Sequence, residues 1–246
     1  MHATEHKRLI TQIVSCMTML ALALPAMAAV APAESGPYDW SGPYLGIYGG
    51  GAKGHDSFRD RNSYNADGSF GYSVDGLLGG VDGGYNWQCK HVVIGLEGEA
   101  GRLGLDDSQQ LPRFQGVRQP DDSRASIRSG FCGSLAARLG YAFDNILIYS
   151  KAGAAGLNEK VSYVDTDPSG LVLDAGTSKN AFRGGFTYGG GIEIGLNQHW
   201  TVKGEYMVAN FDSVSHTATA SNGHQYRFSQ ELKDLQMLKA GVAYKF

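Results

Sequence analysis

The chain has 246 residues, of which 35 are glycine and 18% are charged, and its formal net charge is −3. The mean hydropathy of −0.23 is too low for a bundle of membrane-spanning helices, and the glycine content is too high for a typical helical fold. The negative net charge argues against nucleic acid as a partner, because phosphate binding requires a basic surface.

The first 28 residues are predicted to be a cleaved signal peptide. Lys7 and Arg8 precede an apolar run over residues 9–24, and Ala-Met-Ala at 26–28 fits the small-residue pattern that a signal peptidase reads. The alternatives are a retained membrane anchor, for which this run is short, and lipid attachment at Cys16, beyond which the run continues. Residues 29–40, rich in Ala, Pro and Gly at their start, are expected to form a flexible periplasmic lead-in.

From residue 41 onward, apolar residues repeatedly alternate with polar or small ones, which is the side-chain period of a β-strand. In the last such segment Val242, Tyr244 and Phe246 share one face, while Lys239 and Lys245 lie on the other. Eight strands are predicted, at residues 44–53, 77–87, 91–103, 132–143, 146–156, 182–196 and 200–210, and in the segment that ends at Phe246.

The predicted connections have two different lengths. Tight turns at residues 88–90, 144–145 and 197–198 alternate with long polar loops at about 54–73, 105–130, 158–180 and 212–227. This alternation is typical of outer-membrane barrels, whose turns face the periplasm and whose loops face the exterior. The sequence therefore predicts an all-β fold, an eight-stranded antiparallel up-and-down transmembrane β-barrel over residues 41–246.

Charges of both signs recur on the face opposite the apolar one. If the apolar face meets lipid, these charges point into the lumen. An eight-stranded barrel is just wide enough to be filled by side chains, and isolated buried charges are costly, so we expect ion pairs across the lumen and no wide pore. The predicted lumen charge network comprises Asp82, Glu97, Glu99, Arg138, Lys151, Glu193, Lys203, Glu205 and Lys239.

Other functions of the interior compete with this interpretation. A narrow small-solute channel would need a continuous water path, which mixed charges could line. Glu97 and Glu99 point the same way and could share a proton in acid–base work, although the bases nearby favour ion pairing. A lipid-modifying enzyme would need Ser, His and an acid together, which the histidine positions do not favour. We expect no catalysis, no metal site and no cofactor.

The predicted exterior loops contain residues that could hold haem. His55 lies in the first loop, and His216, His224 and Tyr226 share the last one. Imidazole and phenolate are axial haem ligands, so a haem group could be bound between these loops. The simpler interpretation is that these are solvated polar residues.

The mature chain would keep two cysteines, Cys89 and Cys132. The predicted topology places them at opposite ends of the barrel, whereas a disulfide needs Cα atoms within about 7 Å. Two free thiols are therefore expected.

Short motifs on the predicted strands and turns resemble a known family. They are YDWSGPYLG at residues 38–46, GYNW at 84–87, GLEG at 95–98, RLGYA at 138–142, VKGEY at 202–206 and VAYKF at 242–246. In order and spacing they are similar to the small outer-membrane β-barrel proteins of alphaproteobacteria, a group of major immunogenic surface antigens that includes hemin-binding, porin-like members. The resemblance implies an outer-membrane location. It also implies that the terminal strand with Tyr244 and Phe246 is the signal read by the assembly machinery.

The function expected from these patterns is that of a structural barrel that supports envelope integrity and makes surface interactions through four exterior loops, without catalysis. Its expected partners are outer-membrane lipid and lipopolysaccharide, the outer-membrane assembly machinery, and host or surface ligands. A narrow channel and a haem-binding surface receptor stay open as alternatives.

Overall fold

The computed structural model describes residues 38–60, 69–110, 124–165, 175–220 and 225–246. The signal peptide predicted at residues 1–28 and most of the lead-in, residues 29–37, lie outside the described residues. Within the described ranges no helix is long and apolar enough to cross a membrane.

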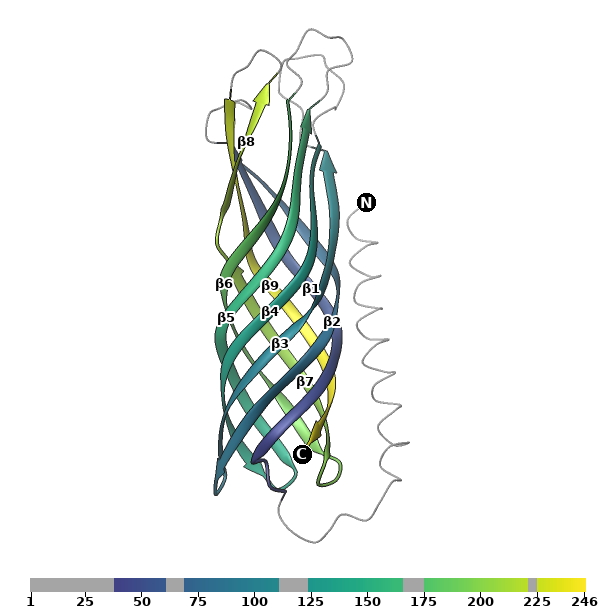
Figure 1. Cartoon of the computed structure of the whole chain (residues 1–246), viewed down its shortest axis with the longest axis vertical. Coiled ribbons are helices and arrows are strands. Elements are labelled where there is room, and N and C mark those ends of the chain that lie inside the picture. Colours follow the sequence, from purple (N-terminus) through teal and green to yellow (C-terminus); the bar gives the residue numbers. More distant parts are fainter. Residues whose placement is uncertain (1–37, 61–68, 111–123, 166–174, 221–224) are drawn as a thin grey trace.

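The strands form one antiparallel sheet that closes into a barrel (Figure 1). They are β1 (Gly42–Asp60), β2 (Ser69–Cys89), β3 (Val92–Gln110), β4 (Arg124–Phe143), β5 (Ile146–Asp165), β6 (Ala175–Gly195), β7 (Trp200–Phe211), β8 (Val214–Ala220) and β9 (Gln225–Lys245). β1 pairs with both β2 and β9, which closes the sheet. β7 and β8 each pair with β6 and β9, so they follow one another in a single position of the wall. The barrel therefore has the eight strand positions that the sequence predicts.

The strands extend further toward the long-loop end than predicted. β1 continues to Asp60, β3 to Gln110 and β5 to Asp165, and β8 lies wholly within the loop predicted at 212–227. A strand of about 20 residues tilted by about 40° rises about 50 Å, twice the apolar band of about 25 Å that such barrels present to lipid. Beyond that band the outer face of the wall meets water instead of lipid, so the apolar alternation fades while backbone pairing continues.

The three tight turns lie at the other end of the barrel. Lys90 and Asp144 have left-handed φ angles of 56° and 52°, and Asp144-Asn145 turns the chain as predicted. The first turn lies at residues 90–91, slightly later than the predicted 88–90. In the third, the Asn197 side-chain oxygen accepts the backbone N–H groups of His199 at 3.0 Å and Trp200 at 2.9 Å.

The two faces of the wall differ as the alternation predicts. Large apolar side chains point outward, including Leu77 and Phe182, which are 79% and 70% exposed. Four exposed aromatic residues surround the short-turn end, as expected for the ring of aromatics at a membrane interface: Trp87, Tyr141, Phe143 and Trp200. Both cysteines in the described part of the chain are free, Cys89 in an exposed position and Cys132 half-buried.

Glycine permits close approach of β1 and β9 where the barrel closes. Gly50 is the register partner of Lys239, and a Cβ atom at Gly50 would lie 2.0 Å from the carbonyl oxygen of Leu238. By contrast, a Cβ atom at Gly204, on the outer face of β7, would have nothing within 4 Å.

The Gly50→Ala variant is therefore expected to destabilise the barrel by about 1–3 kcal/mol, because the wall must move to admit a methyl group. Unfolding by urea in lipid vesicles, followed by heat-modifiable gel mobility, measures this effect. Gly204→Ala is the matched control and should change stability by less than about 0.5 kcal/mol. Equal effects of the two substitutions would contradict the close approach at the closing pair of strands.

Candidate functional site

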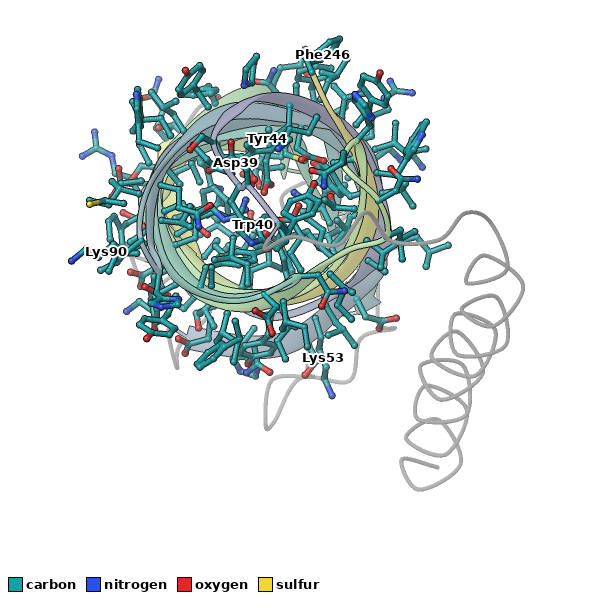
Figure 2. All side chains as sticks on the ribbon, turned by 90° about the horizontal axis from the view of Figure 1, so that it is seen from below. Asp39, Trp40, Tyr44, Lys53, Lys90 and Phe246 are labelled. Atoms are coloured by element: carbon teal, nitrogen blue, oxygen red, sulfur yellow. The ribbon has the colours of Figure 1, made fainter. Side chains whose placement is uncertain are left out.

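The structure places all nine residues of the sequence-predicted charge network inside the barrel. They come from seven strands, β2 to β7 and β9, and eight of them are buried, while Glu99 is half-buried. Figure 2, a view along the barrel axis, shows side chains filling the interior, whereas Lys53, Lys90 and Phe246 lie on the outside. Five carboxylates and four cations thus meet in a space lined by the wall itself.

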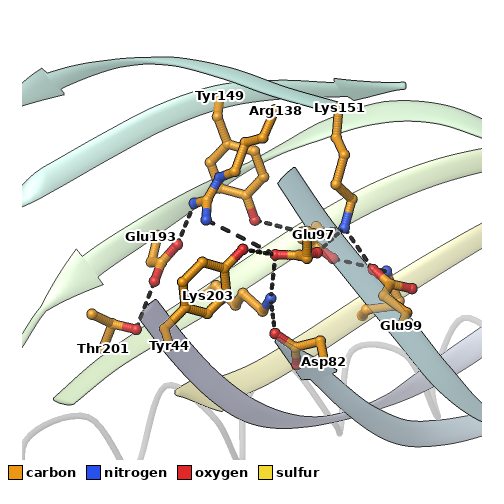
Figure 3. Close-up of polar contacts among 12 residues, drawn as sticks. Tyr44, Asp82, Glu97, Glu99, Arg138, Tyr149, Lys151, Glu193, Thr201 and Lys203 are labelled. Carbon is orange, nitrogen blue, oxygen red and sulfur yellow. Dashed lines mark hydrogen bonds and ion pairs between the residues drawn. The ribbon is translucent and has the colours of Figure 1, made fainter. Parts of the chain in front are cut away.

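Lys151 lies at the centre of this network. Its ammonium group is 2.5 Å from Glu97, 2.6 Å from Glu99 and 3.0 Å from Glu205. Because these partners stand on β3 and β7, and Lys151 on β5, one cation joins three strands of the wall (Figure 3).

Two further lysines extend the network. Lys203 lies 2.6 Å from Asp82 and 3.2 Å from Glu97, and Lys239 lies 2.7 Å from Glu99 and 2.8 Å from Glu205. Glu97, Glu99 and Glu205, which we call the central carboxylates, therefore each contact two ammonium groups. Such geometry offsets the large cost of removing charges from water.

Arg138 occupies the part of the network nearer the short turns. Its guanidinium group forms an ion pair with Glu193 and stacks on the Tyr149 ring, with 3.7 Å between the guanidinium carbon and the ring centroid. The Tyr149 hydroxyl donates to Glu205 at 2.6 Å, and Thr201 donates to Glu193 at 2.6 Å. The Tyr44 hydroxyl, on β1, donates to Glu97 at 2.6 Å, so every strand position of the wall contributes to the network.

Three carboxylates that lie this close together could bind a metal ion, and two of them could act as an acid–base pair. One oxygen from each of Glu97, Glu99 and Glu205 lies within 4.8 Å of the others. However, the Lys151 ammonium group contacts all three, and Lys239 contacts two of them. Ammonium groups thus already supply the positive charge that these oxygens need, and the Lys151 ammonium group bridges Glu97 and Glu99.

An apolar layer lies between the network and the long-loop end. Its members are Ala52, Val74, Leu78, Leu103, Leu105, Leu157, Ala209, Phe211, Leu232 and Leu235. A cavity of about 50 Å³ between the layer and the network borders Glu99, Cys132 and Lys239, and such a volume has room for a few water molecules. The layer separates this small cavity from the exterior end.

A second buried ion pair lies at the far side of the apolar layer. Arg183 is 2.5 Å from Glu159 and donates to the Gln230 carbonyl oxygen at 3.0 Å. This pair was not predicted, because residues 158–180 were expected to form a loop. Asn158, Glu159 and Lys160 are all polar, so no apolar alternation in the sequence marks the continuation of β5 there.

The short-turn end is closed by residues 38–40, which we call the plug. Tyr38 and Trp40 are 5% and 2% exposed and pack against Val93, Ala142 and Leu147. Trp40 donates its backbone N–H to the Gln88 side chain at 2.7 Å, and Figure 2 shows its ring within the barrel outline. These residues were expected to belong to the flexible lead-in, so the plug was not predicted. Their aromatic alternation, Tyr38 and Trp40 around Asp39, was the available signal.

The plug also contacts the terminal strand. The Lys245 ammonium group donates to the Asp39 carbonyl oxygen and lies 4.9 Å from the centroid of the Tyr38 ring. Burial raises the pKa of the Tyr38 hydroxyl above its ordinary value, and the negative charge of Glu193 adds to the rise. Tyr38 therefore stays a neutral phenol at any physiological pH.

Of the four haem candidates, the structure describes the side chain of His55 alone, so the haem hypothesis stays a prediction. His55 is exposed on β1. The backbones of His216 on β8 and Tyr226 on β9 pair with Phe228 and Ala218 respectively. The side chains of His216 and Tyr226, and the whole of His224, lie outside the described residues.

The predicted assembly residues lie at the end of β9. Tyr244 packs against Trp200, with ring centroids 5.2 Å apart, and against Phe246 at the same separation. Phe246 is 68% exposed, and its backbone N–H donates to the Pro43 carbonyl oxygen at 3.1 Å. The terminal aromatic pair therefore faces outward where the barrel closes.

Lys203→Met is expected to lower the free energy of unfolding by about 3–5 kcal/mol, because Asp82 and Glu97 lose a buried cation. Urea unfolding in vesicles measures the loss. Lys233→Met removes an exposed lysine paired with Glu231 and should cost at most about 1 kcal/mol. The double variant Lys203→Met/Asp82→Asn should recover part of the loss. Independent, additive effects at positions 203 and 82 would contradict their coupling.

Comparison with known proteins agrees with this architecture. The family described as "Outer membrane protein beta-barrel domain" matches residues 17–246. The 31 kDa outer-membrane immunogenic protein of Brucella melitensis biotype 1 is 27% identical over 230 residues, which cover 90% of this chain and 89% of the relative. The 25 kDa outer-membrane immunogenic protein of Brucella canis is 28% identical over 217 residues, covering 88% and 84%.

A third relative comes from another genus. The 22 kDa outer membrane protein of Rhizobium leguminosarum bv. viciae is 30% identical over 217 residues, which cover 87% of this chain and 83% of the relative. These matches confirm the resemblance to small outer-membrane barrels of alphaproteobacteria. With a match that spans nearly the whole sequence, this chain belongs to the outer-membrane protein β-barrel family and resides in the outer membrane.

Proposed function

We propose that this chain is a non-catalytic structural barrel that supports envelope integrity and presents its exterior loops for surface interactions. The observation that carries the proposal is the filled lumen. The plug, the charge network and the apolar layer follow one another from the short turns toward the loops. A barrel filled at three levels serves as a stable wall element and not as a conduit.

The chemistry of each level supports this role. The charge network joins strands that are not neighbours in the wall through ion pairs with short contacts, such as Lys151 with Glu99 and Lys203 with Asp82. The apolar layer excludes water, and a hydrophobic constriction stops ion flow by dewetting. A narrow channel would require both levels to open, and the paired charges oppose this.

The surface role is supported by the parts of the barrel that project beyond the apolar band. All four long connections leave from the end at which β1, β3 and β5 extend to Asp60, Gln110 and Asp165. The names of the Brucella relatives describe outer-membrane immunogenic proteins, which accords with exposure at the cell surface. Expected partners are lipopolysaccharide and host or surface ligands at that end, and the assembly machinery at the Tyr244–Phe246 end.

Purified protein in planar lipid bilayers is expected to give no stable current steps. Trp40→Ala should stay equally silent, because the network and the apolar layer still block the lumen. Discrete conductance that changes when Lys203 or Glu205 is replaced would overturn the non-conducting assignment and favour a narrow channel.

In cells, loss of the chain is expected to increase sensitivity to detergent and to large antibiotics that an intact outer membrane excludes. Wild-type protein should restore resistance, and the destabilised Lys203→Met variant should restore it less well at equal synthesis. The Lys233→Met variant is the matched control and should restore resistance fully. Unchanged sensitivity on deletion, with normal protein levels beforehand, would refute the envelope role.

A further inference from the structure

A shallow groove of about 390 Å³ lies on the outer face of the wall formed by β4, β5 and β6. Its floor is formed by small residues, because Gly133 of β4 is the register partner of Gly156 of β5, and Ala154 lies two residues further along β5. Three exposed apolar side chains form its sides: Phe131, Leu135 and Phe182. The Phe182 ring lies over Gly156, where a Cβ atom would be 2.8 Å from it.

The groove lies where the β4–β5 pairing is irregular. The register shifts between Ser129 and Cys132, and Phe131 projects outward beside this shift. A bulge bends a strand and redirects its side chains, which explains why a depression forms here.

Cationic side chains border the groove on the side of the long loops. Arg128 on β4 and Lys160 on β5 are direct register partners, and both are exposed. Arg102 on β3 is exposed and is the register partner of Phe131. The backbone register partner of Arg128 on β3 is Asp106. Arg and Lys side chains both donate charge-assisted hydrogen bonds to phosphate oxygens, so one phosphate group can bind two such neighbouring cations.

The height of this patch matches the outer boundary of the membrane. Along β4, residues 131–141 connect Phe131 to the aromatic ring at the short-turn end, where Tyr141 lies. This length of strand rises about 25 Å at a tilt of about 40°, the height of the lipid-facing band. Phe131 thus lies at the upper edge of the band, and Arg128 and Lys160 lie at the level of lipid headgroups.

We propose that this groove and its cations form a binding site for one phosphorylated glycolipid of the outer leaflet. An acyl chain lies along the floor of Gly133, Gly156 and Ala154, and a headgroup phosphate is held by Arg128 and Lys160, with Arg102 beside them. The apolar groove lies at the depth of the lipid acyl chains, and the cations lie at the depth of the headgroup phosphates. The site specifies the surface-interaction part of the proposed function, whereas the non-conducting lumen is independent of it.

The test measures binding of lipid A to the purified barrel in detergent by native mass spectrometry, with lipid A that carries its phosphates or lipid A from which they are removed. Each cation near an anionic lipid contributes a factor of about five to binding, so Arg128→Gln/Lys160→Gln should weaken binding of phosphorylated lipid A about 25-fold. Ala154→Trp, which fills the groove, should weaken binding of both lipids.

The matched control is Lys53→Gln/Lys233→Gln, which removes two exposed cations from β1 and β9 on the opposite side of the barrel. This variant should bind like the wild type, and all variants should keep heat-modifiable gel mobility. Equal loss in both double variants, or no loss in Arg128→Gln/Lys160→Gln, would overturn the phosphate site. Unchanged binding by Ala154→Trp would overturn the groove. Neither result affects the conductance measurement, which tests the proposed function separately.

Discussion

The rest of this structure depends on the demand that every backbone N–H and C=O group in the membrane must find a partner within the protein. A sheet meets that demand only by closing, and here β1 closes it by pairing with β9 from Tyr44–Lys245 to Asp60–Phe228. Closure with eight strand positions sets a diameter at which side chains from opposite walls touch. The inward face therefore has to be a packed interior, and the charges on it have to find one another.

The charge network is the consequence of that confinement. Lys151, Lys203 and Lys239 each contact carboxylates on other strands, so strands that are not neighbours in the wall are joined through the lumen. Replacing such ion pairs with apolar residues often leaves the free energy of unfolding unchanged. We therefore interpret the network as specifying which strands lie across the lumen from each other. Because the lumen charges are paired with one another, the lumen does not open easily. Side chains that partners can contact are therefore those on the outer face of the wall and in the loops. The cationic groove on β4 to β6 is one place where the outer wall departs from a uniform apolar surface.

The fold could be predicted because alternation, tight turns and long polar connections all carry local signals. Asp144-Asn145 and Asn197 mark turns because Asp and Asn side chains favour turn conformations. Each inward charge is predicted because it lies an odd number of residues along the strand from an outward apolar residue. The outer halves of the strands could not be predicted, since residues such as Glu159 and Lys160 lie where both faces of the wall are polar. The pairing of individual charges also escaped prediction, because it depends on the register between distant strands. Tyr38 and Trp40 were missed for a related reason: their burial requires a barrel mouth that the segment itself does not encode.

The plug gives the three tryptophans of this chain distinct surroundings. Trp40 is enclosed by protein, whereas Trp87 and Trp200 are 53% and 46% exposed on the outer face. A fluorescence quencher attached to lipid reaches Trp87 and Trp200 but not Trp40. Tryptophan fluorescence can therefore distinguish insertion of the barrel from docking of its N-terminal segment. Quenching of Trp87 and Trp200 therefore reports insertion of the barrel into lipid, and protection of Trp40 reports docking of the plug into the barrel mouth.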